Sequence, residues 1–228
     1  MISRDSGQPR LLVFDWDGTL MDSVGTIVAC TQTVLRELRM PEVPQSIIRG
    51  TIGLGLRETV EILSPGCDDQ VFETVLASYR WHWHQTYRDL ALLFSGVEEM
   101  LRGLAEEGYL LAIATGKSRR GLDHSLAQTG LEKVFHATRT VDEALSKPNP
   151  QMLLDILDEL GIRAREAVMI GDTTYDLEMA RNAGTAAIGV CSGSHGREEL
   201  LRAAPLACLE QVVELPEWLS ASREPVLT

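Results

Sequence analysis

The order of apolar and amphipathic segments predicts an α/β fold with a doubly wound parallel sheet and an inserted helical cap domain. Three observations lead to this prediction. Short, almost wholly apolar runs recur along the chain, which is typical of strands buried on both faces of a parallel sheet. Amphipathic helical segments separate most of these runs. After the first run, about seventy residues show helical patterns and no convincing strand.

The apolar runs predict five strands, each bounded by turn residues. They are Leu11–Phe14, Leu110–Ala114, Val134–Thr138, Ala167–Ile170 and Thr185–Val190. Helical patterns flank the later ones, at Val97–Glu107, Ser118–Thr129, Pro150–Leu160 and Asp176–Asn182. In sheets of this Rossmann-like kind, ligands bind beyond the carboxyl ends of the strands. Asp15, Thr115 and Asp172 stand at three of those ends, and we therefore expect the functional site there.

The inserted region divides the predicted chain into two domains. Apolar positions at helical spacing predict helices over Val24–Leu38, Leu56–Leu63 and Val71–Tyr87. We assign residues 1–22 and 95–228 to an α/β core and residues 23–94 to a helical cap. Glycine-containing joints at Gly18–Asp22 and Phe94–Gly96 would connect the two domains and let the cap move.

Composition excludes several classes of function. The 228 residues are 44% hydrophobic and 24% charged, with a net charge of −12, which suits a soluble globular protein and disfavours nucleic acid as a partner. The four cysteines form no CxxC pair and predict neither a zinc site nor a disulfide scaffold. No apolar run is long enough to span a membrane, and the first residues do not form a signal peptide. We expect a cytoplasmic protein, either a monomer or a homodimer.

Two acidic motifs follow predicted strands. In Asp15-Trp16-Asp17-Gly18-Thr19, one carboxylate is placed to attack or bind a metal and the other to transfer protons; an Asp-rich turn that caps a helix explains this pattern equally well. In residues 171–176, Asp172 and Asp176 are four positions apart and share a face if the turn is helical. Carboxylates in this arrangement suit Mg²⁺, although a capped helix start alone also accounts for them.

Two further pieces carry hydroxyl and basic groups. Thr115-Gly116-Lys117-Ser118 follows the second predicted strand, where a hydroxyl and backbone N–H groups at a helix start can cradle a phosphate. It is not a Walker A loop, and an ordinary helix cap is the plainer interpretation. Lys147 precedes a helix that begins with proline, and a single lysine there says little by itself.

Taken together and in order, these four pieces resemble the haloacid dehalogenase-like (HAD) hydrolase superfamily, from about Leu11 to about Leu209. The string from Phe14 to Ser23, the Lys147-Pro148-Asn149-Pro150 segment and residues 171–176 are similar to its phosphoglycolate-phosphatase-like branch, which carries a cap after the first motif. The resemblance implies an Asp15 nucleophile, Asp17 as acid and base, and phosphate binding by Thr115, Gly116 and Lys147. It further implies Mg²⁺ held by Asp15, the Asp17 carbonyl and Asp172, with Asp176 either as a further ligand or orienting a metal-bound water.

The expected function is that of a Mg²⁺-dependent phosphatase acting on a small phosphorylated metabolite, phosphoglycolate-like or a sugar phosphate, through an aspartyl-phosphate. A sugar-phosphate mutase of the same superfamily and a catalytically silent binding protein on the same fold are the alternatives. The glycine-rich loop from Arg49 to Gly55 lies in the predicted cap. In similar proteins this loop faces the active site, so Arg49 is a candidate substrate ligand, or else part of a plain helix–helix connection.

Overall fold

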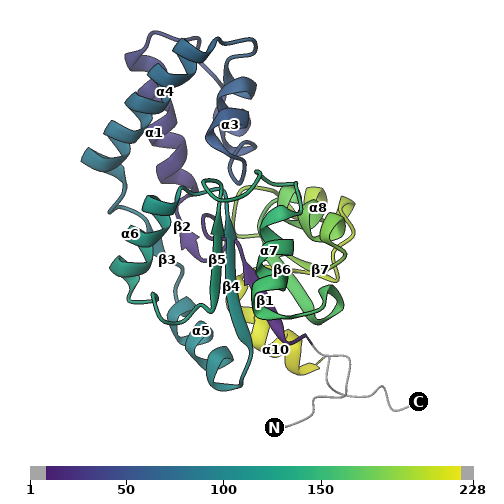
Figure 1. Cartoon of the computed structure of the whole chain (residues 1–228). Helices are drawn as coiled ribbons and strands as arrows, with labels where there is room; N and C mark the ends of the chain where they lie inside the picture. The colour runs from purple at the N-terminus through teal and green to yellow at the C-terminus, as the bar shows by residue number, and fades with distance from the viewer. Residues whose placement is uncertain (1–8, 222–228) are drawn as a thin grey trace.

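In a computed structural model of the chain, residues 9–221 are described, and their central feature is a parallel β-sheet (Figure 1). Among these residues, six strands form the sheet in the order β5-β4-β1-β6-β7-β8, and every neighbouring pair is parallel. The strands are β1 (Leu11–Phe14), β4 (Leu110–Thr115), β5 (Ala137–Thr140), β6 (Ala167–Gly171), β7 (Ala186–Val190) and β8 (Ala207–Leu209). The predicted doubly wound α/β class is confirmed.

Helices cover both faces of the sheet and bury it completely at its centre. One face packs against α5 (Val97–Glu106), α6 (Arg119–Thr129), η3 (Val212–Glu214) and α10 (Leu215–Ala221). The other packs against α7 (Gln151–Leu160), α8 (Thr174–Ala183) and α9 (Arg197–Arg202), with η2 (Ala164–Glu166) leading into β6. Leu12 and Phe14 of β1 point into the first layer, and Leu11 and Val13 into the second. This two-sided burial explains why β1 is a continuous apolar run.

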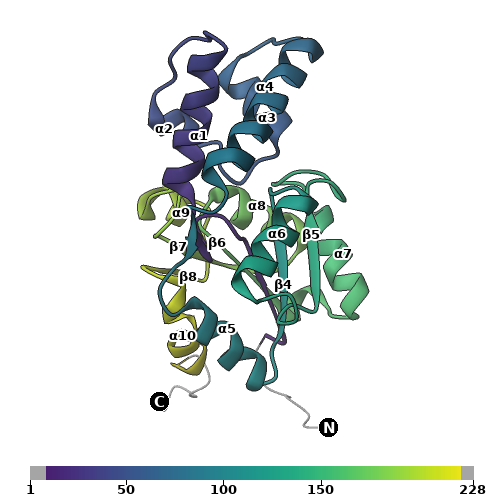
Figure 2. The same ribbon diagram turned by 90° about the vertical axis from the view of Figure 1, so that its left-hand side faces the viewer.

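The residues after β1 build a group of helices at one end of the sheet (Figures 1 and 2). They are α1 (Val24–Glu37), α2 (Gln45–Arg49), α3 (Leu56–Leu63), α4 (Asp69–His82) and the π-helical turn η1 (Trp83–Tyr87). Their apolar side chains form two clusters separate from the sheet's own core. The two connections to the core pair with each other as a short antiparallel ribbon of β2 (Met21–Asp22) and β3 (Leu92–Leu93). The domain limits at 22/23 and 94/95 stay a prediction, and residues 1–8 and 222–228 of the predicted core lie outside the described range.

Several elements differ from the sequence prediction. β5 covers Ala137–Thr140 rather than 134–138, because an edge strand that ends in Arg139 and Thr140 shows no apolar run. The helix expected to reach Tyr87 is α-helical only to His82. The sequence does not predict α2 or β8, because these elements are too short for a hydrophobic periodicity to be recognised. No helix among residues 9–221 is long and apolar enough to cross a bilayer.

Candidate active site

Three sheet strands bring the predicted motifs to one place. Phe14, the last residue of β1, lies opposite Ile113 of β4 and Ile170 of β6. By this register Asp15 lies level with Ala114 and Gly171, and Thr115 and Asp172 follow one residue further along the neighbouring strands. The chain adds β4 and β5 on one side of β1 and then β6, β7 and β8 on the other, so the order of the strands reverses at this point, and ligands bind at such switch points.

A cluster of three buried carboxylates occupies this point. Ligand oxygens of Asp15, Asp172 and Asp176 all lie within 4.8 Å of one another, and each side chain is at most 1% exposed. Burial, with further repulsion from Asp176 and Asp172, raises the pKa of Asp15 to about 8 despite the attraction of Lys147. Burial and the charge of Asp176 raise the pKa of Asp172 to about 6. The cluster thus holds carboxyl groups together where both burial and their mutual repulsion disfavour the charged form.

Lys147 supplies the compensating charge. Its ammonium nitrogen lies 2.7 Å from Asp15 Oδ1 and 2.6 Å from Asp176 Oδ1, and its side chain is fully buried. Burial by itself would lower the pKa of Lys147, but attraction by Asp15 and Asp176 outweighs it and leaves that pKa above its ordinary value. Lys147 is therefore a permanent cation at the centre of the site.

Backbone and hydroxyl groups orient the two acids that follow β6. Asp172 accepts hydrogen bonds from the Thr19 hydroxyl at 2.8 Å and from the Ser194 N–H at 2.7 Å. Asp176 Oδ2 accepts from the Thr173 hydroxyl and N–H, so that Thr173 and Asp176 cap α8 reciprocally. Gly18 has φ +86°, and a Cβ there would lie 2.4 Å from Asp172 Oδ2. Only glycine lets this turn approach Asp172 so closely.

Asp17 is held by two partners that belong to different elements. The Ser23 hydroxyl donates to Asp17 Oδ1 at 2.7 Å, and Lys117 Nζ lies 2.8 Å from each carboxylate oxygen. The sequence pattern gives Lys117 no role of its own, because a lone lysine at a helix start is ordinarily exposed. Its position two residues beyond Thr115, at the end of β4, is the signal that could have found it.

The carboxylate cluster fits a divalent cation with oxygen ligands. Neither oxygen of Asp15 has a well-directed hydrogen bond within residues 9–221, and the Lys147 contact is an ion pair to one of them. A cation beside Asp15 would engage the remaining lone pairs and relieve the repulsion that raises the carboxyl pKa values. Hard carboxylate donors suit Mg²⁺, Mn²⁺ or Ca²⁺ rather than a thiolate-preferring metal.

A cavity of about 710 Å³ opens above Asp15, Asp17 and Thr115. The loop of residues 53–55 from the helical insertion lines it, together with Gly116. A Cβ on Gly116 would lie 2.8 Å from the Gly53 carbonyl oxygen, so the insertion and the core touch here. Gly55 N also donates to the Ser146 hydroxyl at 2.7 Å, next to Lys147. The segment from Thr115 to Ser118 therefore borders the cavity on one side and touches the insertion on the other.

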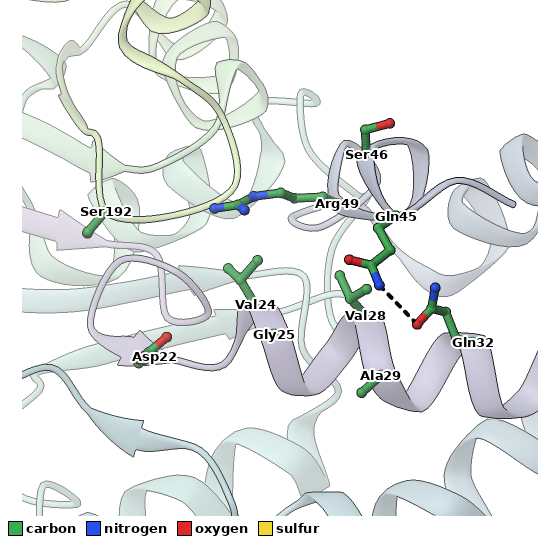
Figure 3. Close-up of a pocket in the computed structure, with 10 residues that line it drawn as sticks. All are labelled: Asp22, Val24, Gly25, Val28, Ala29, Gln32, Gln45, Ser46, Arg49 and Ser192. Carbon is green, nitrogen blue, oxygen red and sulfur yellow. Dashed lines mark hydrogen bonds between the residues drawn. The ribbon is translucent and has the colours of Figure 1, made fainter.

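Arg49 lies elsewhere than the sequence interpretation expects. Its guanidinium donates to the carbonyl oxygens of Gly193, at 2.5 Å, and Ser194, at 3.2 Å. It lines a second pocket of about 530 Å³ beside α1 and extends toward the loop that carries Ser192 (Figure 3). It does not line the cavity above Asp15. Because α2 ends beside the β7–α9 loop, Arg49 bridges the insertion to the core instead of reaching the buried carboxylates.

Comparison with known proteins agrees with this geometry. A protein-family model described as haloacid dehalogenase-like hydrolase matches residues 12–190. The chain is 37% identical over 209 residues to the probable phosphatase IndB of Dickeya dadantii (strain 3937), covering 90% of this chain and 91% of that one. It is 33% identical over 212 residues to the pyrophosphatase PpaX of Listeria monocytogenes serotype 4a (strain HCC23), covering 92% and 96%.

A solved structure extends the likeness to three dimensions. The crystal structure of a putative haloacid dehalogenase-like hydrolase from Bacteroides fragilis superposes with a TM-score of 0.86 at 27% identity, covering 91% of this chain and 100% of the other. Family model, relatives and fold agree over nearly the whole length. The chain belongs to the haloacid dehalogenase-like hydrolase family.

Proposed function

We propose that this protein is a Mg²⁺-dependent phosphatase that hydrolyses a small phosphorylated metabolite through an aspartyl-phosphate on Asp15. The observation that carries the proposal is the contact between Asp15 and Lys147 inside a cluster of buried carboxylates. Bound Mg²⁺ would supply the positive charge that lets an anionic carboxylate approach a phosphate dianion. Asp15, Asp172 and the Asp17 carbonyl would bind it directly. Asp176 would not be a direct ligand, because both of its carboxylate oxygens already accept hydrogen bonds.

In the first half-reaction, Asp15 attacks phosphorus and the bond from phosphorus to the leaving-group oxygen breaks. Asp17 donates a proton to that oxygen, which departs as an alcohol. Thr115, the N–H of Gly116 and the Lys147 ammonium hold the transferring phosphoryl oxygens. In the second half-reaction, Asp17 removes a proton from a water that attacks phosphorus. The bond from phosphorus to Asp15 breaks, and inorganic phosphate is released.

The decisive experiment measures phosphate release from 4-nitrophenyl phosphate and from a panel of phosphorylated metabolites, with Mg²⁺ and with excess chelator. We expect multiple turnovers that require the metal and that disappear in Asp15→Asn. Mass spectrometry of acid-quenched wild-type protein should find the phosphate on Asp15. Glu132→Gln, an exposed acid on the α6–β5 loop, is the matched control and should behave as wild type.

Three results would contradict the proposal in different ways. Turnover by Asp15→Asn would show that Asp15 is not the nucleophile. Conversion of a hexose phosphate to its isomer without phosphate release would identify a mutase. No turnover of any phosphate ester with Mg²⁺ present would identify a silent binding protein.

A further inference from the structure

The cavity above Asp15 has a buried base and an exposed rim. Asp15 and Thr115 line its base and are each 1% exposed. Arg80 of α4 and Arg120 of α6 line the same cavity, and both residues are exposed, so they define its rim. One arginine comes from the helical insertion and the other from the helices that cover the sheet (Figures 1 and 2). A molecule bound at Asp15 therefore reaches both arginines if it extends from the base to the rim.

Both rim arginines lack an acidic partner. Within residues 9–221, neither side chain takes part in a hydrogen bond or an ion pair. Two other cations that line the cavity are matched, since Arg57 pairs with Asp69 at 2.9 Å and Lys117 pairs with Asp17 at 2.8 Å. The whole chain carries a net charge of −12, so two unmatched arginines at one rim reverse the overall charge locally.

The acids that line the cavity do not neutralise this rim. Of the described residues around the cavity, four are acids, and none forms an ion pair with either rim arginine. Asp15 and Asp17 pair with lysines at the base. Asp142 accepts a hydrogen bond at 2.8 Å from the first backbone N–H of α6, and Glu58 lies against the loop of residues 53–55. The positive charge of the rim is therefore left for a ligand.

His84 adds a third basic group to the rim. It lines the cavity from η1, and its Nδ1 atom is buried without a hydrogen-bond partner in the described part of the chain. Burial lowers the pKa of His84, and so do the charges of Arg120 and of three further basic residues that include Arg80. Both rim arginines thus lie close enough to one imidazole to repel its charged form.

We propose that the leaving group of the substrate carries a second anionic group, a carboxylate or a phosphate, which binds between Arg80, His84 and Arg120. The proposal rests on the proposed function, because it places the scissile phosphoryl group at Asp15. Guanidinium groups bind carboxylates and phosphates through paired N–H donors, and the imidazole would donate from Nδ1. An anion in this position would also offset the repulsion among three basic groups that belong to two parts of the chain.

Lys117 and Trp83 separate the two anionic groups of such a substrate. Lys117 Nζ lies 2.8 Å from the Asp17 carboxylate and 5.3 Å from the ring centroid of Trp83, which directly precedes His84 in η1. The leaving group therefore passes this ammonium group and this ring on its way from the reaction centre to the rim. A flexible four-carbon chain that ends in the second anion is suited to this path.

Four-carbon phosphate esters that differ in their terminal group test the proposal. We would measure kcat/KM with Mg²⁺ for 4-phosphooxybutyrate, its neutral amide, 4-aminobutyl phosphate and butane-1,4-diol bisphosphate. An exposed charged contact contributes about threefold, so with two arginines the anionic esters should exceed the amide by about tenfold, and the ammonium ester should be poorest. A preference for only one of the two anions supports the proposal and identifies the second group. Equal values for both anionic esters and the amide would overturn it.

Removing the rim charges should remove the preference. Arg80→Met and Arg120→Met, made separately, should each lower the ratio of kcat/KM for 4-phosphooxybutyrate to its amide by about threefold, and the double variant should bring the ratio to about one. Arg165→Met is the matched control, because it removes an exposed arginine on η2 that does not line the cavity, and it should keep the wild-type ratio. An unchanged ratio in the folded double variant would contradict the assignment of the rim.

Binding without turnover separates this proposal from the proposed function. In 5-phosphonopentanoate and its amide a carbon–phosphorus bond replaces the ester, so neither is turned over, and titration calorimetry with Mg²⁺ measures their binding. The carboxylate should bind the wild-type protein about tenfold more tightly than the amide. If no ester is hydrolysed but this difference is found, the proposed function fails and the anion site stands. Equal affinities would overturn the anion site whatever the catalytic result.

Discussion

The ammonium nitrogen of Lys117 lies 2.8 Å from both carboxylate oxygens of Asp17 and 5.3 Å from the ring centroid of Trp83. One side chain from the turn between β4 and α6 thus touches the turn after β1 and the π-helical turn of the insertion. Both members of the ion pair are mostly shielded from solvent. Lys117 therefore positions the proposed proton-transfer group, and the same ammonium group also contacts Trp83 of the insertion.

Replacement of Lys117 by methionine should lower kcat by about tenfold or more, because Asp17 loses the partner that fixes both of its oxygens. General acid–base catalysis contributes typically 10²–10⁴-fold, and a misplaced acid forfeits part of that. Steady-state kinetics on an alkyl phosphate measures the effect. Lys133→Met removes an exposed lysine and should leave kcat unchanged. Equal kinetics in both variants would show that Lys117 has no positioning role.

Replacement of Lys147 by methionine should destabilise the fold. Asp15 and Asp176 would lose their buried counter-charge, a change that costs about 3–5 kcal/mol when one partner of a buried pair is removed. Urea unfolding in the presence of a chelator measures the free energy. Lys147→Arg should recover only part of it, because a planar guanidinium does not fit an ammonium site. A free energy of unfolding equal to that of Lys133→Met would refute the prediction.

Asp15→Asn should abolish turnover without loss of stability. Burial disfavours the charged carboxylate, as its pKa of about 8 indicates, so a neutral amide removes an electrostatic cost. An amide is a poor nucleophile and cannot form the phosphoryl ester. We expect a melting temperature equal to or above that of the wild type, alongside no phosphate release. A sharply lowered melting temperature would mean that Asp15 is chiefly structural.

Mg²⁺ should raise the melting temperature of the wild-type protein. A ligand present at 100 times its dissociation constant stabilises the folded state by about 2.7 kcal/mol. Asp172→Asn should lose most of this gain because it removes a ligand charge from the cluster, whereas Glu132→Gln should retain it. Thermal unfolding with increasing MgCl₂ gives the comparison. The same gain in all three proteins would place the cation elsewhere.

Arg49→Ala should act through the core loop rather than through the substrate. Arg49 holds the carbonyl oxygens of Gly193 and Ser194, and the Ser194 N–H binds Asp172. We therefore expect kcat/KM for ethyl and hexyl phosphate to fall by the same factor, and a higher Mg²⁺ concentration to be needed for half-maximal activity. A loss confined to one of the two esters would restore the interpretation of Arg49 as a substrate ligand.

Local patterns in the sequence were enough to locate most of the proposed site. Asp15, Thr115 and Asp172 end apolar runs, and in a parallel sheet the carboxyl ends of adjacent strands share an edge, so their meeting place follows from the pattern. The order of the motifs along the chain also indicates the family. The positions of α3 and of the strands β1, β4 and β6 followed within a residue or so, because buried runs and amphipathic faces are long enough to be visible.

The partners of long side chains could be decided only by tertiary structure. A lysine reaches in any direction from its backbone, so nothing in residues 115–118 indicates that Lys117 meets Asp17, and nothing near residue 49 indicates that Arg49 turns to the β7–α9 loop. The cavity above Asp15 is likewise not indicated by the sequence. Its lining comes from the turn after β1, from the segment after β4 and from the helices of the insertion, and these segments, far apart along the chain, meet only when the insertion packs over the end of the sheet.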